Sequence, residues 1–107
     1  MNIYPSDIET AILEHPKIIS CVVLGINDTY LVEVPVAVLK CSGNEKSVER
    51  DLRLSLKQNL ASHQRPMKFF FREELPLNST GKIDKLSLKE ELNNLNLDLS
   101  AKLRLFN

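Results

Sequence analysis

The chain has 107 residues, 43% of them hydrophobic, and its 14 lysines and arginines equal its 14 aspartates and glutamates in number. This length fits one domain with a modest hydrophobic core, and the balanced charge argues against a general affinity for nucleic acid or anionic membranes. Neither a signal peptide nor an apolar run of membrane-spanning length is visible, so we expect a cytoplasmic protein. The cysteines and histidines do not show metal-ligand spacing, so no metal site is expected.

The first predicted element is a helix near the N-terminus. Ser6 and Glu9 have the spacing of a capping box, in which the serine caps the helix and the glutamate reaches back to the backbone of the cap. Ile8 and Ile12 recur one helical turn apart and predict an apolar face. The helix should end before Pro16, because the residue that precedes a proline disfavours helical geometry.

Two strands are predicted next, separated by a turn at residues 25–30. Residues 18–24 are rich in β-branched side chains, which favour a buried strand, and residues 34–40 predict a second strand. Cys21 and Cys41 lie within these strands or at their ends. We therefore expect both thiols to be buried.

A longer helix follows, and Ser47 is predicted to cap it. Four aliphatic residues recur at every fourth position and predict one apolar stripe: Val48, Leu52, Leu56 and Leu60. Leu54 falls off this stripe, so it should face an edge or a partner. The helix cannot continue through Pro66.

Residues 68–72 predict a third strand. Consecutive side chains of a strand point to opposite faces, so the phenylalanines at residues 69–71 predict that both faces are at least partly buried. Leu86, Leu88 and Leu92 then predict a short terminal helix.

The predicted elements define an α+β fold, in which about three helices pack on a small mixed sheet of about three main strands. We assign residues 1–92 to this domain and residues 93–107 to a leucine-rich tail. The alternating leucines of the tail fit a strand as well as a fraying helix. We expect so many apolar groups to pack on the domain or on a second copy of the chain, which would weakly favour a homodimer.

The polar run within residues 75–85 is the most informative stretch. Asn, Ser and Thr side chains bond their own backbone and Gly81 permits a positive φ angle, so we expect an exposed loop. Lys82 follows the glycine and can extend its ammonium toward a phosphate or carboxylate outside the domain. A P-loop is excluded, because that motif requires glycine at Pro76 and serine or threonine at Ile83.

Several short motifs, the last of them in this loop, occur in order along the chain. They are NIYPSDIE (2–9), HP (15–16), GIND (25–28), EVPVA (33–37), LASHQRP (60–66), ELP (74–76) and TGKI (80–83). Together they resemble the small C-terminal domain of the AMP-forming acyl-adenylating enzymes. That superfamily includes acyl-CoA synthetases, adenylation domains of nonribosomal peptide synthetases and firefly luciferase. The resemblance covers residues 2–92 and implies the same α+β architecture as the predicted elements.

The resemblance implies that the complete enzyme activates a carboxylic acid with ATP and transfers the acyl group to coenzyme A. Lys82 would be the catalytic lysine of adenylation, and Mg²⁺ bound in the larger domain would help to neutralise the phosphates. The domain would rotate between the two half-reactions. This chain would be inactive without the missing N-terminal adenylate-forming domain, and we expect it to bind none of these ligands tightly alone.

Five further residues complete the predicted site. Ser79, Thr80 and Gly81 are expected to shape the substrate loop, and Arg65 and Lys68 are candidates for contacts with coenzyme A phosphates. Two alternatives stay open. One is the equivalent domain of a carrier-protein-loading adenylation enzyme, whose acceptor is the pantetheine of a carrier protein. The other is a non-catalytic interaction module that retains the fold.

Overall fold

The computed structural model describes residues 4–26 and 34–94, and a mixed sheet lies at its centre. The strands are β1 (Ile18–Ile26), β2 (Val34–Cys41) and β3 (Lys68–Phe71), in the order β1-β2-β3. β1 and β2 pair antiparallel, whereas β2 and β3 pair parallel. A parallel pair requires a crossover connection, which the helix between β2 and β3 supplies.

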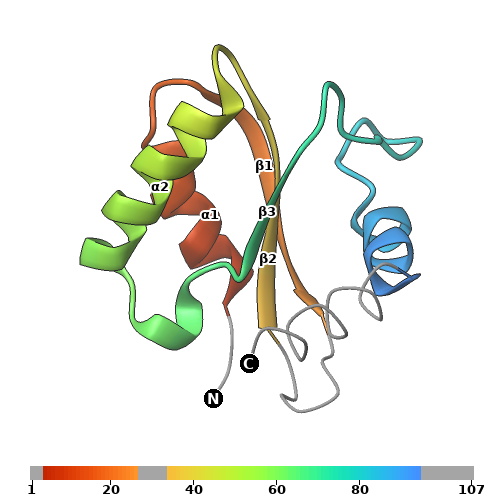
Figure 1. The fold of residues 1–107 in the computed structure, drawn as a ribbon. Coiled ribbons are helices and arrows are strands. Elements are labelled where there is room, and N and C mark those ends of the chain that lie inside the picture. The colour runs from red at the N-terminus through yellow and green to blue at the C-terminus, as the bar shows by residue number, and fades with distance from the viewer. Residues whose placement is uncertain (1–3, 27–33, 95–107) are drawn as a thin grey trace.

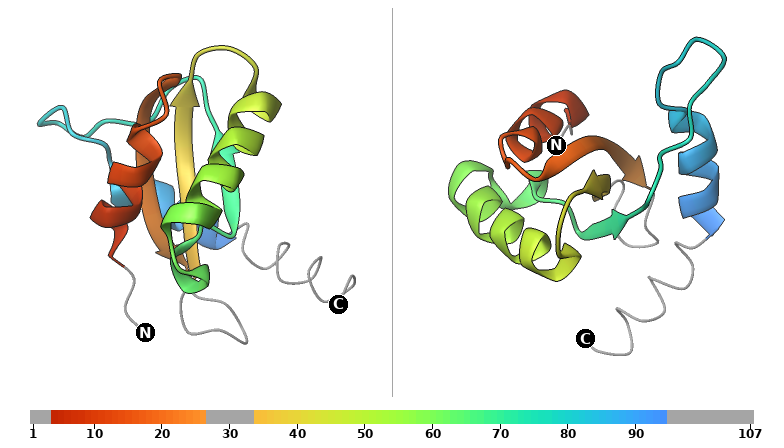
Figure 2. Two further views of the ribbon diagram at one scale, coloured as in Figure 1. Left: turned by 90° about the vertical axis from the view of Figure 1, so that its left-hand side faces the viewer. Right: turned by 90° about the horizontal axis from the view of Figure 1, so that it is seen from above.

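Helices cover both faces of the sheet, so the domain has three layers. Helices α1 (Pro5–Leu13) and α2 (Glu45–Asn59) lie on one face (Figure 1). Figure 2 shows that the helix at residues 85–94 lies on the other face. The predicted α+β fold is therefore confirmed. No helix in the described part of the chain is long and apolar enough to cross a bilayer.

Each face of the sheet carries its own hydrophobic cluster. Phe69 belongs to the cluster beneath α1 and α2, and Phe71 packs against that cluster. Phe70 packs against the cluster on the opposite face, which includes Leu88 and Leu92 of the helix at residues 85–94. Both faces of β3 are therefore covered, as the phenylalanine run predicts.

The capping box predicted at the start of α1 is wrong. Tyr4 occupies the N-cap position without a capping side-chain hydrogen bond, and the first helical residue is Pro5, whose fixed φ angle suits a helix start. Ser6 therefore lies inside the helix. Glu9 turns toward the sheet instead, where its Oε2 accepts a 2.8 Å hydrogen bond from the backbone N–H of Val23 in β1.

The predicted cap of α2 is also wrong, although its predicted apolar stripe is confirmed. Asn44 caps this helix, and its Oδ1 accepts a 2.9 Å hydrogen bond from the backbone N–H of Ser47. The stripe residues that are 1% exposed are Val48, Leu52 and Leu56. Leu60 is half-buried, and Leu54 lies off the stripe with 61% of its surface exposed.

The first strand extends further than predicted. Gly25 and Ile26 continue β1 into the predicted turn, because they pair with Pro35 and Val34 of β2. The rest of that turn, residues 27–30, lies outside the described residues, as do residues 95–107 of the predicted tail. The division of the chain into a domain and a tail therefore stays a prediction.

The terminal helix is present, but Leu86 was wrongly assigned to its apolar face. Leu88 is 1% exposed and Leu92 is 3% exposed, whereas Leu86 is 70% exposed. The side chains of Leu88 and Leu92 lie one turn apart, so they share the face that meets the sheet. Leu86 lies two residues before Leu88 and therefore points to another side of the helix.

The two cysteines differ in burial, so the expectation of two buried thiols is correct only for Cys21. Cys21 lies within β1 and is 8% exposed. Burial, with a smaller contribution from the charge of Glu9, raises the pKa of the Cys21 thiol to about 12. Cys41 ends β2 and is only partly buried.

We expect a thiol reagent to modify Cys41 well before Cys21 in the folded chain. At mildly alkaline pH, a thiol with a pKa of about 12 is almost entirely protonated, and the thiolate is the nucleophile. Mass spectrometry of the native chain during reaction with iodoacetamide should show one modification at Cys41, and Cys21 should react only after denaturation. Equal native rates at the two cysteines would contradict the burial of Cys21.

Candidate functional site

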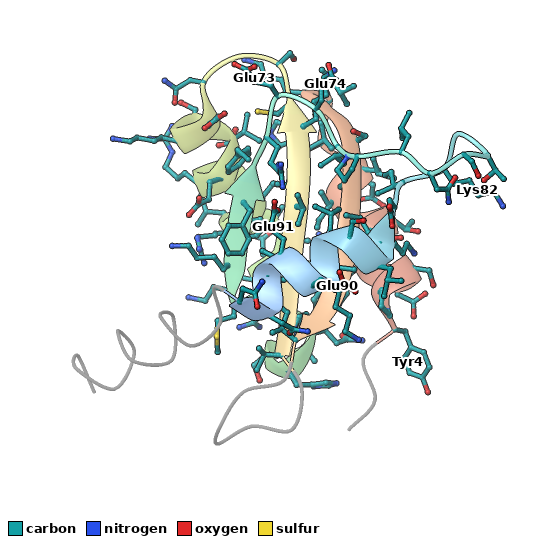
Figure 3. All side chains as sticks on the ribbon, turned by 90° about the vertical axis from the view of Figure 1, so that its right-hand side faces the viewer. Tyr4, Glu73, Glu74, Lys82, Glu90 and Glu91 are labelled. Carbon is teal, nitrogen blue, oxygen red and sulfur yellow. The ribbon has the colours of Figure 1, made fainter. Side chains whose placement is uncertain are left out.

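The predicted lysine lies at the tip of a loop that stands away from the sheet. We call residues 77–83 the lysine loop. Leu77 and Ile83 form an antiparallel bridge that closes it, and the backbone N–H of Asp84 donates a 2.8 Å hydrogen bond to the carbonyl of Pro76 just outside the bridge. Figure 3 shows the loop extending from the body of the domain, with Lys82 at its far end.

Asn78 organises the inside of the lysine loop. Its side-chain Oδ1 accepts hydrogen bonds from the backbone N–H of Thr80 at 3.0 Å, the hydroxyl of Thr80 at 2.6 Å and the backbone N–H of Lys82 at 3.1 Å. Its backbone N–H donates to the carbonyl of Lys82 at 2.7 Å, and its carbonyl accepts from Gly81 at 3.0 Å. Sequence reasoning treated Asn78 only as a turn former and did not assign it to the site.

Gly81 gives the loop a backbone conformation that other residues adopt at a cost. Its φ angle is +84°, in the left-handed region, and a Cβ atom built there would meet no atom within 4 Å. The glycine is therefore required for its dihedral angle rather than for space. The positive φ predicted from the sequence is confirmed.

The Lys82 side chain is exposed, as predicted, and available to a partner outside the domain. Within the described part of the chain, its ammonium makes no ion pair or hydrogen bond. Of the other predicted loop residues, Ser79 is exposed and Thr80 directs its hydroxyl to Asn78. The loop thus presents a lysine ammonium that is available to bind a phosphate or a carboxylate.

Asp84 connects the lysine loop to the helix at residues 85–94. Its two carboxylate oxygens accept hydrogen bonds from Ser87, one from the backbone N–H at 3.1 Å and one from the hydroxyl at 2.7 Å. This is the bonding pattern of a helix N-cap. The two hydrogen bonds from Ser87 lower the pKa of the Asp84 carboxyl below its ordinary value, and the bond from the Ser87 side chain has the larger effect.

We expect the stabilisation supplied by Asp84 to depend on pH. Because its pKa is lowered by folding, this stabilisation is fully present above the ordinary pKa of aspartate and is lost as the pH falls through the lowered pKa. Urea unfolding of wild type and Asp84→Ala should therefore show a difference in stability at neutral pH that shrinks in strong acid. An unchanged difference across that range would exclude a role for the charged carboxylate.

The two candidates for coenzyme A contacts lie away from the lysine loop. Arg65 follows α2 and donates from Nε to the carbonyl of Leu60 and from Nη2 to the carbonyl of Lys57, each at 3.1 Å. It therefore satisfies carbonyls at the end of α2. Lys68 is the first residue of β3 and is exposed. The structure does not bring these residues together with Lys82, because α2 and the helix after the loop cover opposite faces of the sheet (Figure 1).

Arg65 also lines a cavity of about 210 Å³ between α2 and β3. Phe69 and Arg53 also line it, and the guanidinium of Arg53 lies 4.9 Å from the centre of the Phe69 ring. Throughout residues 4–26 and 34–94, no three acidic, cysteine or histidine side chains are grouped closely enough to hold a metal ion.

Comparison with known proteins defines the class. The sequence model of the AMP-binding enzyme C-terminal domain matches residues 7–82, well over half of the chain. The chain therefore belongs to the AMP-binding enzyme C-terminal domain family.

Individual relatives agree with this assignment. The chain is 39% identical over 92 residues to YhfT, an uncharacterized acyl–CoA ligase of Bacillus subtilis, covering 86% of this chain and 18% of the relative. It is 36% identical over 90 residues to a 2-succinylbenzoate–CoA ligase of Bacillus pumilus, covering 84% of this chain and 18% of the relative. A fatty acyl CoA synthetase of Mycobacterium tuberculosis superposes with a TM-score of 0.78 at 30% identity, covering 88% of this chain and 18% of that structure. The chain thus spans less than a fifth of the length of these relatives.

Proposed function

We propose that this domain supplies the catalytic lysine of an AMP-forming acyl-CoA ligase. The observation that carries the proposal is the ammonium of Lys82, which is exposed at the tip of a loop that projects from the domain. It makes no ion pair or hydrogen bond with the described residues. A residue held in this way can enter an active site formed mainly by another domain. The family to which the chain belongs supports the same role.

The chemistry of adenylation needs a cation where Lys82 would be delivered. A carboxylate oxygen of the acid attacks the α-phosphorus of ATP, the bond to the β-phosphate breaks, and pyrophosphate leaves with the negative charge. Two anionic groups must approach each other, and charge accumulates on the phosphate oxygens in the transition state. An ammonium that contacts both the carboxylate and these oxygens stabilises that transition state more than the separated substrates.

ATP, the acid and Mg²⁺ would bind chiefly to the larger domain. Mg²⁺ prefers carboxylate and phosphate oxygens in octahedral geometry, and the described residues do not group such carboxylates. The described part of this domain therefore does not fit a magnesium site, and we assign the metal no step on this chain.

The second half-reaction transfers the acyl group from AMP to the thiol of coenzyme A. We propose that the domain rotates between the half-reactions and withdraws Lys82 in the second. Of the two residues proposed to meet coenzyme A phosphates, Lys68 is exposed, whereas Arg65 already donates two hydrogen bonds to α2. Lys68 is therefore the better placed of the two to gain a phosphate contact.

We expect the isolated 107-residue chain to neither form an acyl-adenylate nor exchange pyrophosphate into ATP. It has no glycine-rich phosphate loop, and its described residues contain no grouped metal ligands. The assay is incorporation of labelled pyrophosphate into ATP by the purified chain with a panel of carboxylic acids. Exchange above the level of a protein-free control would contradict an active site formed mainly by the larger domain.

Activity should return when the chain is joined to a larger domain of the same family. The test protein, called here the joined enzyme, carries residues 4–94 of this chain in place of the matching segment of the Bacillus pumilus 2-succinylbenzoate–CoA ligase. Adenylation and thioester formation are then measured separately, the latter from supplied acyl-adenylate. A joined enzyme that folds but lacks both activities would count against the proposed function.

A further inference from the structure

We propose that Asn78 is a positioning residue for adenylation, which fixes the backbone from which Lys82 extends. The proposal rests on the proposed function of Lys82. Asn78 touches neither reacting group in this account. It acts through the lysine alone.

The hydrogen bonds of Asn78 engage both backbone groups of Lys82. The backbone N–H of Lys82 donates to Oδ1 of Asn78 at 3.1 Å, and the carbonyl of Lys82 accepts from the backbone N–H of Asn78 at 2.7 Å. Oδ1 also holds the intervening Thr80 by its backbone N–H and its hydroxyl. Because backbone N–H groups only donate, the atom that receives them must be the amide oxygen, which settles the orientation of the Asn78 side chain.

Among the described residues, the restraints on Lys82 are the bridge at the base of the loop and the hydrogen bonds within the loop. The bridge between Leu77 and Ile83 fixes the base of the lysine loop, but residues 77–82 are all exposed. Figure 3 shows the tip standing away from the helix and the sheet, so packing against the described part of the domain does not restrain it. The order at the tip must then come from hydrogen bonds inside the loop, and the Asn78 side chain accepts three of them.

A lysine that is delivered to the active site of another domain needs a fixed backbone position. A charged group stabilises a transition state best when it is preorganised where the charge develops, and a misplacement of about 1 Å can cost a factor of about 10² in rate. Asn78→Ala removes the acceptor but leaves the ammonium, the glycine and the loop length unchanged. We therefore expect adenylation to slow about 10-fold to 100-fold in the joined enzyme. The loss should fall on kcat, with the KM values for ATP and the acid nearly unchanged.

The first experiment measures backbone order in the chain itself. Amide hydrogen exchange, followed by NMR, should show faster exchange at Thr80 and Lys82 in Asn78→Ala, with the sheet unaffected. Asn59→Ala is the matched control, because Asn59 is an exposed asparagine at the end of α2 whose side chain, among the described residues, bonds only Ser55. Unchanged exchange at Lys82 in Asn78→Ala would overturn the proposal, whatever the role of the lysine.

The second experiment asks whether Asn78 acts through Lys82. Adenylation rates of the joined enzyme are measured for wild type, Asn78→Ala, Lys82→Ala and the double variant. A residue that acts only by positioning the ammonium has nothing to position once the ammonium is gone, so Asn78→Ala should cause no further loss in the Lys82→Ala background. A general structural defect would instead reduce the adenylation rate by the same factor in both backgrounds, and that result would overturn the proposal.

The rates of the single variants distinguish the role of Asn78 from that of Lys82. A normal rate for Asn78→Ala, with a large loss for Lys82→Ala, overturns the positioning role and leaves the proposed function standing. A normal rate for Lys82→Ala overturns the proposed function and the role of Asn78 with it. Asn78→Ser should recover part of the rate, because a serine hydroxyl accepts from the local backbone more weakly than an asparagine amide oxygen does.

Discussion

Lys82→Ala in the joined enzyme should slow acyl-adenylate formation by about 10²–10³, which corresponds to the roughly 3–4 kcal/mol typical of one preorganised charge contact. The loss should be this large because the ammonium would act where carboxylate and phosphate charges approach. The measurement is the single-turnover rate of adenylate formation with saturating ATP and acid.

The companion measurements make this result specific to one half-reaction. Thioester formation from supplied acyl-adenylate should fall much less, because in the proposed mechanism the rotated domain has withdrawn Lys82. Lys85→Ala is the control, since Lys85 is a second exposed lysine close to the loop, and its effect on either step should be milder. Unfolding free energies should stay within about 0.5 kcal/mol of wild type, as for most surface substitutions. Equal losses in both half-reactions with folding intact would remove the half-reaction-specific role.

Leu88→Ala should destabilise the domain by about 2–5 kcal/mol, the usual range for a fully buried leucine. Leu88 is 1% exposed and packs in the cluster that includes Leu75 and Leu92, with Ile83 against it. Leu75 precedes the lysine loop and Ile83 closes it, so this cluster also holds the base of the loop on the sheet. Urea unfolding, followed by circular dichroism, gives the free-energy change.

Leu86→Ala is the matched control, because it makes the same substitution in the same helix at a residue that is 70% exposed. Its effect should stay within about 0.5 kcal/mol of wild type. Similar losses for Leu86→Ala and Leu88→Ala would show that the helix at residues 85–94 does not pack on the sheet through Leu88.

The elements and layers were largely predictable from hydrophobic spacing. Phe69, Phe70 and Phe71 occupy successive positions, which a strand buries only when both of its faces are covered, and the structure covers both faces. The stripe that begins at Val48 required one helix face to be buried, and the structure buries it. Such patterns are local, because each helical turn, or each second residue of a strand, again requires an apolar side chain on the buried face.

The helix starts were not predictable in the same way. Ser6 and Ser47 satisfy capping statistics, but a cap depends on where the chain leaves extended geometry, and Pro5 and Asn44 decide that point. The partner of Glu9 is 14 residues away in β1, so no local rule identifies it.

The candidate site was likewise predictable only in part from the sequence. The exposed position of Lys82 and the positive φ of Gly81 follow from the turn chemistry of the loop, and both are confirmed. The three bonds to the Asn78 side chain depend on the closed shape of the whole loop, which the sequence pattern does not specify. The hydrogen bonds of Arg65 likewise depend on the path of the chain after α2.

The proposed function requires a positive charge at position 82, and chemical restoration of that charge tests this requirement most directly. The starting protein is the joined enzyme with Lys82→Cys and Cys41→Ser, because Cys41 is the accessible native cysteine of this domain and Cys21 is buried. Treatment with 2-bromoethylamine lets the thiolate displace bromide and yields a side chain close to lysine in length with a terminal ammonium. We predict that Lys82→Cys loses adenylation and that modification restores most of it, while Lys82→Ala treated identically stays inactive. Complete modification without recovery, or full activity before modification, would contradict the account.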